Sequence, residues 1–218
     1  MIPRPWVILL AAGAARRFGG PKLLVRLHGE SVVRRAARIA LGCTPAGCVV
    51  VLGARSALLR RELRGFPLRI VVNRHWQAGL AGSLRAGLAA LPRAAPAALV
   101  QLADQVAIGP ADLELLIAGW HQAPRSIVTA RAGGIRTPPA IFPRRLFREL
   151  KRVRGDKGAR ALLRDPARDV VDIEMPAAAA DLDRPSDLAR LTRPRGRGRT
   201  PQSVRSSRAR RSRSSGGT

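Results

Sequence analysis

Short apolar runs alternate along the chain with longer segments whose apolar residues recur every three or four positions. The short runs are apolar at consecutive positions, which predicts strands that are buried on both faces of a sheet. The longer segments have the period of amphipathic helices, with arginines opposite the apolar stripe in 31–41. The predicted strands are 7–10, 49–52, 70–72, 99–102, 127–130 and 170–173. The predicted helices are 31–41, 57–63, 83–91 and 112–120, the last of which is opened by Pro110 near its first turn.

This order of elements predicts the class of fold. Strands that alternate with helices form right-handed βαβ units, so we expect an α/β fold of three layers with a mostly parallel sheet. Ligands of such sheets bind beyond the carboxyl ends of the strands. The candidate binding loops are therefore those that follow Leu10, Leu52, Val72 and Leu102.

The composition changes at about residue 192. The last 27 residues hold nine arginines and almost no apolar side chains, so they bury too little surface to offset the entropy of ordering. We expect a folded domain at 1–191 and a disordered Arg/Ser-rich tail at 192–218. The net charge of the chain is +26, and the domain remains basic without the tail.

A basic protein attracts phosphates, whether these belong to nucleotides, nucleic acids or membrane surfaces. An arginine-rich and alanine-rich composition is also typical of a GC-rich genome, so charge alone does not choose among these ligands. The chain has no apolar run of 18 residues, and we expect no membrane span. Cys43 and Cys48 have neither CxxC spacing nor the pattern of a secreted scaffold, which predicts a reduced, cytoplasmic protein.

The first predicted strand runs into a loop of small residues at 10–22, LAAGAARRFGGPK. Small residues let backbone N–H groups approach a triphosphate, and Arg17 and Lys22 offer positive charge to its oxygens. Leu23 follows the lysine, so the loop is not a Walker A motif, and it is not a G-x-G-x-x-G loop. The alternative interpretation is a glycine-rich turn with two solvated cations.

The loop resembles the LAAGxSxRMGxxK signature of the MobA-like nucleotidyltransferases, and most closely that of the molybdenum cofactor cytidylyltransferase branch. Ala15 stands in place of the serine and Phe18 in place of the methionine. The resemblance extends over about residues 6–191. Five more segments resemble family motifs in the same order: 73–84 (NPxWxxGMxxSL), 102–105 (LxDQ, with Val106 in place of proline), 133–142 (GxxGxPxxF, with Thr-Pro-Pro at 137–139), 155–160 (GDxGAR) and 181–188 (DIDTPEDL).

The resemblance implies a Rossmann-like nucleotidyltransferase fold and transfer of a nucleoside monophosphate from an NTP, with CTP as donor, onto a phosphorylated acceptor. The implied acceptor is molybdopterin with bound molybdate, and a molybdoenzyme or its maturation chaperone is an implied partner. It also implies roles for individual residues: catalysis by Arg17, Lys22 and Asp104; nucleotide binding by Leu10, Ala11, Ala12, Gly13, Arg17, Lys22, Gly79 and Ser83; acceptor binding by Asp156 and Arg160.

Asp104 follows a buried strand, where a carboxylate is costly unless it meets a cation. It lies about six residues before the next predicted helix, too far to cap it, so Mg²⁺ is the expected partner. By analogy with the family, Asp183 is the second metal ligand. Asp181 remains an alternative, because two residues along an extended segment share one face.

Several alternatives stay open at this point. Ser83 is also placed to cap a helix, Trp76 to anchor the core, and Asp156 with Arg160 to form a surface ion pair. Rival functions are a GTP-using guanylyltransferase, a sugar-phosphate nucleotidyltransferase and, from another class, a basic nucleic-acid-binding protein. The Asp104-Gln105 pair resembles the cytidylyl branch, and the scarcity of aromatic residues leaves only the tail suited to nucleic acid.

Overall fold

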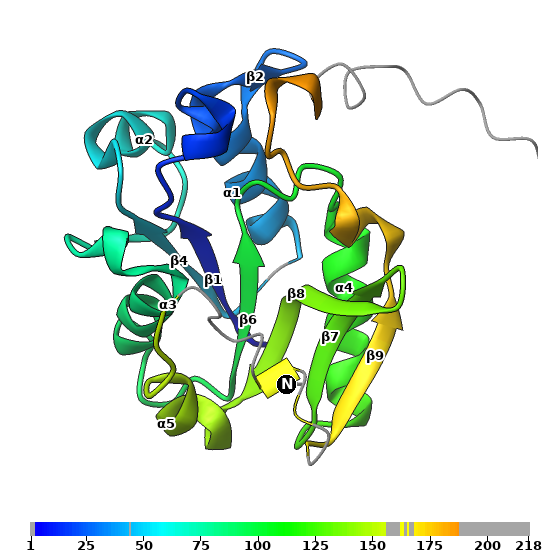
Figure 1. The fold of residues 1–218 in the computed structure, drawn as a ribbon. Coiled ribbons are helices and arrows are strands. Elements are labelled where there is room, and N and C mark those ends of the chain that lie inside the picture. Colours follow the sequence, from blue (N-terminus) through cyan, green and yellow to red (C-terminus); the bar gives the residue numbers. More distant parts are fainter. Residues whose placement is uncertain (1–2, 44, 156–161, 164, 166–167, 188–218) are drawn as a thin grey trace, which may run out of the picture.

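A computed structural model describes residues 3–43, 45–155, 162–163, 165 and 168–187. Seven strands form one sheet in the order β5-β4-β1-β6-β8-β7-β9 (Figure 1). The strands are β1 (Trp6–Ala11), β4 (Gly47–Leu52), β5 (Arg69–Val72), β6 (Ala97–Leu102), β7 (Ile127–Ala132), β8 (Ile135–Pro143) and β9 (Val170–Glu174). A two-stranded sheet joins β2 (Arg26–Leu27) to β3 (Glu30–Ser31).

Helices cover both faces of the large sheet. The helices are α1 (Val32–Gly42), α2 (Ser56–Glu62), α3 (Leu80–Ala89), α4 (Pro110–Gln122) and α5 (Phe147–Leu150). Successive side chains of a strand point to opposite faces, and β1 shows the division: Val7 and Leu9 pack with α1, α2 and α4, whereas Ile8 and Leu10 pack with α3 and α5. The three-layer α/β fold with a mostly parallel sheet is thus confirmed, with β1, β4, β5 and β6 mutually parallel and β9 parallel to β7.

All six predicted strands are present, but two of them are not buried on both faces. β5 and β9 are the edge strands of the sheet, and their side chains are half-buried or exposed. The pattern also missed β8, which lies between β6 and β7 and is antiparallel to both. This segment contains Pro138 and Pro139, which cannot donate ladder hydrogen bonds and weaken the sequence signal of a strand.

The start of one helix differs from the prediction in a way that affects the site. α3 begins at Leu80 instead of 83, because Gly79 adopts a φ of +99° and serves as its N-cap. α4 begins at Pro110, the residue that the sequence predicts at its opening, and its N-cap Gly109 donates its backbone N–H to Asp112 Oδ2 at 2.8 Å.

Other expectations concern parts of the chain outside the described residues. These are the domain boundary at 191, the tail at 192–218, and the acceptor residues Asp156 and Arg160. Within the described ranges, every helix is too short or too polar to span a lipid bilayer.

Candidate active site

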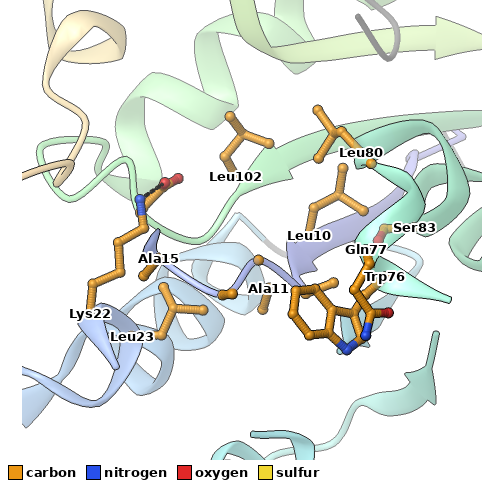
Figure 2. A pocket seen from close by; sticks show the side chains of 15 residues that line it. Leu10, Ala11, Ala15, Lys22, Leu23, Trp76, Gln77, Leu80, Ser83 and Leu102 are labelled. Carbon is orange, nitrogen blue, oxygen red and sulfur yellow. Dashed lines mark hydrogen bonds and ion pairs between the residues drawn. The ribbon is translucent and has the colours of Figure 1, made fainter. Parts of the chain in front are cut away.

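A cleft of about 360 Å³ opens beyond the carboxyl ends of β1 and β6. Figure 2 shows its two ends, with Lys22 on one side and Trp76, Gln77 and Ser83 on the other. The loops after β1 and β6 form the cleft together with the start of α3, as expected for a parallel sheet. The lining residues are Leu10, Ala11, Ala12, Gly13, Ala14, Ala15, Lys22, Leu23, Trp76, Gln77, Gly79, Leu80, Ser83, Leu102 and Asp104.

The loop after β1 offers backbone donors to the cleft. Ala12 at its start is held in place, because its carbonyl accepts the N–H of Ala54 at 3.1 Å. Ala15 adopts a left-handed φ of +56°, which residues other than glycine, asparagine and aspartate seldom adopt. In the described part of the chain, the N–H groups of Gly13, Ala14 and Ala15 donate no hydrogen bond. Three free N–H groups in one small-residue loop form a surface suited to phosphate oxygens.

Lys22 joins this loop to two carboxylates at the same end of the cleft. It begins a short 3₁₀ turn, η2 (Lys22–Leu24), which the buried side chain of Leu23 anchors. Its Nζ lies 2.5 Å from Oδ2 of Asp104 and 3.2 Å from Oδ1 of Asp183. Burial disfavours the charged ammonium, but the two carboxylates outweigh burial, and the pKa of Lys22 is raised above its ordinary value.

Backbone pairing places Asp183 beside Asp104. The N–H of Leu182 donates to the carbonyl of Asp104 at 3.0 Å, and Asp181 forms an antiparallel bridge with Gln105. Of the two candidate acids, Asp183 is the one whose carboxylate contacts Lys22.

A carboxylate four residues further on fixes the backbone at Asp183. Oδ2 of the buried Asp187 accepts the N–H groups of Asp183 at 3.0 Å and Arg184 at 2.8 Å. Arg17 lies across from this turn, with its Nη1 3.7 Å from Oδ2 of Asp183, and its side chain is 80% exposed. Arg17 is therefore a solvent-exposed charge, whereas Lys22 is largely buried, with a side chain that is 12% exposed.

The two carboxylates fit a divalent cation. Asp104 and Asp183 converge on one positive centre, the ammonium of Lys22, and both supply oxygen, the ligand atom that Mg²⁺ prefers. No group of three or more acids, histidines or cysteines suited to a metal occurs among the described residues. Mg²⁺ binds through one or two carboxylates plus water and substrate phosphates, so two acids beside a phosphate-binding loop are sufficient.

The other end of the cleft is mostly apolar. Ser83 lies in the first turn of α3 and not at its N-cap, and it is 2% exposed. Trp76 lines the cleft, and its side chain packs against Gly53, where a Cβ would collide with it. Trp76, Leu10, Leu80 and Leu102 give this end its apolar lining.

The structure gathers most of the predicted site residues in one place. The predicted nucleotide residues Leu10 to Gly13, Lys22, Gly79 and Ser83 line the cleft together with Asp104, whereas Arg17 and Asp183 lie at its rim. Two further residues have no assigned role in the sequence patterns, although both stand inside quoted motifs. Asn73 bonds to Ser83, and Asp187 holds the backbone of Asp183.

Comparison with known proteins identifies relatives over most of the chain. Residues 7–171 match the model of the MobA-like NTP transferase domain. The chain is 32% identical over 197 residues to nicotine blue oxidoreductase of Paenarthrobacter nicotinovorans, covering 84% of this chain and 94% of that protein. It is 29% identical over 199 residues to the purine catabolism protein PucB of Bacillus subtilis, covering 85% of this chain and 95% of that protein.

Solved structures also match this chain over most of its length. Rv0371c of Mycobacterium tuberculosis superposes with a TM-score of 0.77 at 26% identity, covering 88% of this chain and 99% of that one. A structure of Rv0371c in complex with manganese matches with a TM-score of 0.74 at 25% identity, covering 87% of this chain and 98% of that one. A relative of similar length therefore binds a divalent metal.

Proposed function

The chain belongs to the MobA-like NTP transferase family, and we propose that it transfers CMP from CTP to a phosphorylated, molybdopterin-type acceptor. The observation that carries this proposal is the cluster of Lys22, Asp104 and Asp183 beside the free N–H groups of the loop after β1. A cation, two carboxylates and backbone donors at one end of an apolar slot suit a nucleoside triphosphate with its metal.

In this reaction a terminal phosphate oxygen of the acceptor attacks the α-phosphorus of CTP. The bond from that phosphorus to the bridging oxygen breaks, and pyrophosphate leaves with the electron pair. Gly13, Ala14 and Ala15 hold phosphate oxygens through their N–H groups, and Lys22 adds a positive charge where negative charge develops. No nucleophilic side chain is needed, since the protein acts by positioning and electrostatics.

Asp104 and Asp183 would hold the metal, which we propose to be Mg²⁺. When bound, the metal neutralises charge on the phosphate oxygens. The two carboxylates differ in exposure, with Asp104 at 21% and Asp183 at 47%. Asp104 would therefore be the more buried ligand, and Asp183, in the 181–187 segment, would be the more exposed one.

The choice of CTP and of a molybdopterin acceptor rests on the motif resemblance, above all Asp104-Gln105 in the loop after β6. Gln105 has a structural task there: its Nε2 donates to the carbonyls of Pro138 at 2.6 Å and Ala178 at 3.1 Å. It thereby joins the loop that carries Asp104 to β8 and to the segment before Asp181.

We further propose a reducing cytoplasmic location, supported by two buried thiols that form no disulfide, Cys43 and Cys48.

The test is the release of pyrophosphate by the full-length protein with Mg²⁺, a molybdopterin acceptor and each NTP in turn. We expect pyrophosphate with CTP, dependent on both acceptor and metal. Preference for GTP would assign the chain to guanylyl transfer, and release with a sugar phosphate as acceptor would replace the molybdopterin. Absence of pyrophosphate with every NTP would contradict the proposal.

A second candidate function is hydride transfer, because the relative with 32% identity is named an oxidoreductase. The loop at 10–22 does not favour it, since it lacks the G-x-G-x-x-G pattern of dinucleotide sites. The two functions are separated by thermal shift. NTP with Mg²⁺ should stabilise a transferase by about 2.7 kcal/mol at a hundredfold its Kd, whereas NAD(P)H should stabilise an oxidoreductase.

A further inference from the structure

Asn73 and Ser83 form a buried hydrogen-bonded pair at the mostly apolar end of the cleft, opposite Lys22. This end is called the base end below, because the nucleotide base would bind there. Asn73 follows β5, and its backbone N–H is fixed by the carbonyl of Leu52 at 2.8 Å. The residue is 9% exposed, and its side chain reaches α3, where Nδ2 donates to Oγ of Ser83 at 3.1 Å. Two buried polar side chains from different elements thus meet at the cleft wall, where Ser83 is a lining residue.

The direction of this hydrogen bond is determined by a third group. The backbone N–H of His75 points at Oδ1 of Asn73 at 3.0 Å. A backbone N–H can only donate, so the amide oxygen must face His75 and the NH₂ must face Ser83. Oγ of Ser83 therefore accepts from Asn73.

A hydroxyl that accepts one hydrogen bond still has its own hydrogen to donate. Within the described residues, the Ser83 hydroxyl hydrogen has no acceptor, although Ser83 is 2% exposed and lines the cleft. A buried hydroxyl without an acceptor is costly, which favours a ligand that supplies one. The only carboxylate among the lining residues is Asp104, which is engaged with Lys22 at the opposite end.

We propose that Asn73 is a positioning residue that turns the Ser83 hydroxyl into a hydrogen-bond donor for O2 of a pyrimidine base. This inference rests on the proposed function, and it names the class of base. A pyrimidine meets the donor with its ring carbonyl. Guanine also has a ring carbonyl, O6, but the N1–H and N2–H groups beside it are donors that need acceptors. The lining residues at the base end of the cleft include no carboxylate to accept them.

The test compares binding of CTP with binding of GTP and of inorganic tripolyphosphate, each with Mg²⁺, by calorimetry. Ser83→Ala removes the hydroxyl. Asn73→Asp keeps an oxygen for His75 but replaces the NH₂ by a second acceptor, which draws the Ser83 hydrogen away from the cleft. We expect each change to weaken CTP binding about tenfold, the size of one buried hydrogen bond, and to leave tripolyphosphate binding unchanged.

The two changes should also be non-additive, because both remove the same donor. The double variant should bind CTP no more weakly than Ser83→Ala alone. The matched control is Thr129→Val, which deletes a buried hydroxyl that donates to the carbonyl of Thr137 on the far part of the sheet. It should lower the melting temperature without changing CTP affinity.

Three outcomes would overturn the inference. Asn73→Asp with wild-type CTP affinity would show that Asn73 does not set the direction of the Ser83 hydroxyl. An equal loss of tripolyphosphate binding in both variants would indicate a general structural defect. An equal loss of GTP and CTP binding would remove the pyrimidine preference. Failure of the wild-type protein to bind any triphosphate, tripolyphosphate included, would instead refute the proposed function together with this inference.

Discussion

The ammonium of Lys22 lies 2.5 Å from Oδ2 of Asp104, a residue 82 positions further along the chain. It also reaches Asp183 at 3.2 Å, so one cation bridges the two proposed metal ligands. In a nucleotidyltransferase this ammonium has two possible partners, the carboxylates and the phosphates. A metal ion and Lys22 therefore compete for the same carboxylate oxygens, and phosphate binding gives Lys22 an alternative.

This competition predicts opposite effects of Lys22→Met on metal and nucleotide. Without the ammonium, Mn²⁺ alone should bind more tightly, as measured by electron paramagnetic resonance in the absence of nucleotide. With CTP, KM should rise and kcat should fall on the order of a thousandfold, as is typical when a transition-state contact is lost. The control is Lys151→Met, an exposed lysine outside the cleft, which should change neither. Weaker Mn²⁺ binding in Lys22→Met would contradict the competition.

Asp104→Asn should affect catalysis much more than folding. The amide keeps the shape of the side chain but removes the charge that holds the metal, so kcat should fall by orders of magnitude, with partial rescue at high Mg²⁺. Lys22 retains Asp183 as a partner, so the variant should still unfold cooperatively. Glu114→Gln, which removes a carboxylate that pairs with Arg4 outside the cleft, is the matched control. Turnover by Asp104→Asn within about threefold of wild type would rule out the metal assignment.

The sequence predicted the parts of the fold that local patterns determine. Consecutive apolar residues at 7–10 and 99–102 identify buried strands whichever neighbours they pair with, and the loop from Leu10 to Lys22 follows directly from the first. The sequence pattern did not predict β8, because the place of this strand between β6 and β7 is decided by tertiary pairing. Thr137, Pro138 and Pro139 weaken its local strand signal.

Within the site, too, features set by local sequence could be predicted, whereas contacts set by tertiary packing could not. Asp104 could be predicted because a carboxylate after a buried strand needs a cation. The contacts of Asn73 with Ser83 and of Asp187 with Asp183 could not, because each depends on how one segment folds over another. Ser83 was expected near a helix start, but whether it caps the helix or faces the cleft depends on Gly79, whose φ of +99° moves the helix start to Leu80.

Alkaline pH should destabilise the protein through its two thiols. Burial raises the pKa of Cys43 to about 11 and that of Cys48 to about 12, with the nearby Glu114 and Cys43, respectively, adding to the effect. An unfolded thiol ionises at a pKa of about 8.5. Below that pH both states hold their protons and stability is unaffected. Above it the unfolded state loses protons first, so stability falls by about 1.4 kcal/mol per pH unit for each thiol until the folded pKa is reached.

Urea unfolding under reducing conditions at pH 8 and pH 10 measures this slope. Few other side chains titrate in this pH range, because the chain has no tyrosine and its only lysines are Lys22, Lys151 and Lys157. Lys22, whose folded pKa is raised above 10.5, adds a loss of the same sign only at higher pH. The double variant Cys43→Ala, Cys48→Ala should lose most of the slope. An unchanged slope in that variant would assign the effect to other groups.

Asp187 should control metal affinity without touching the metal. Its Oδ2 alone accepts both N–H groups, those of Asp183 and Arg184, so an amide oxygen at the same place can keep both hydrogen bonds. Asp187→Asn should therefore retain Mn²⁺ affinity in the presence of CTP. Asp187→Ala removes the acceptor, which typically costs about 1 kcal/mol for a capping side chain, and frees the turn that carries Asp183. We expect Mn²⁺ binding to weaken several-fold, with Ser186→Ala, an exposed neighbour, as the control.

Because the backbone bonds of Leu182 and Asp181 to the Asp104 loop remain, the segment should stay attached and only the orientation of the Asp183 carboxylate should be lost. Equal Mn²⁺ affinity in Asp187→Ala and Asp187→Asn would mean that those backbone bonds alone position Asp183.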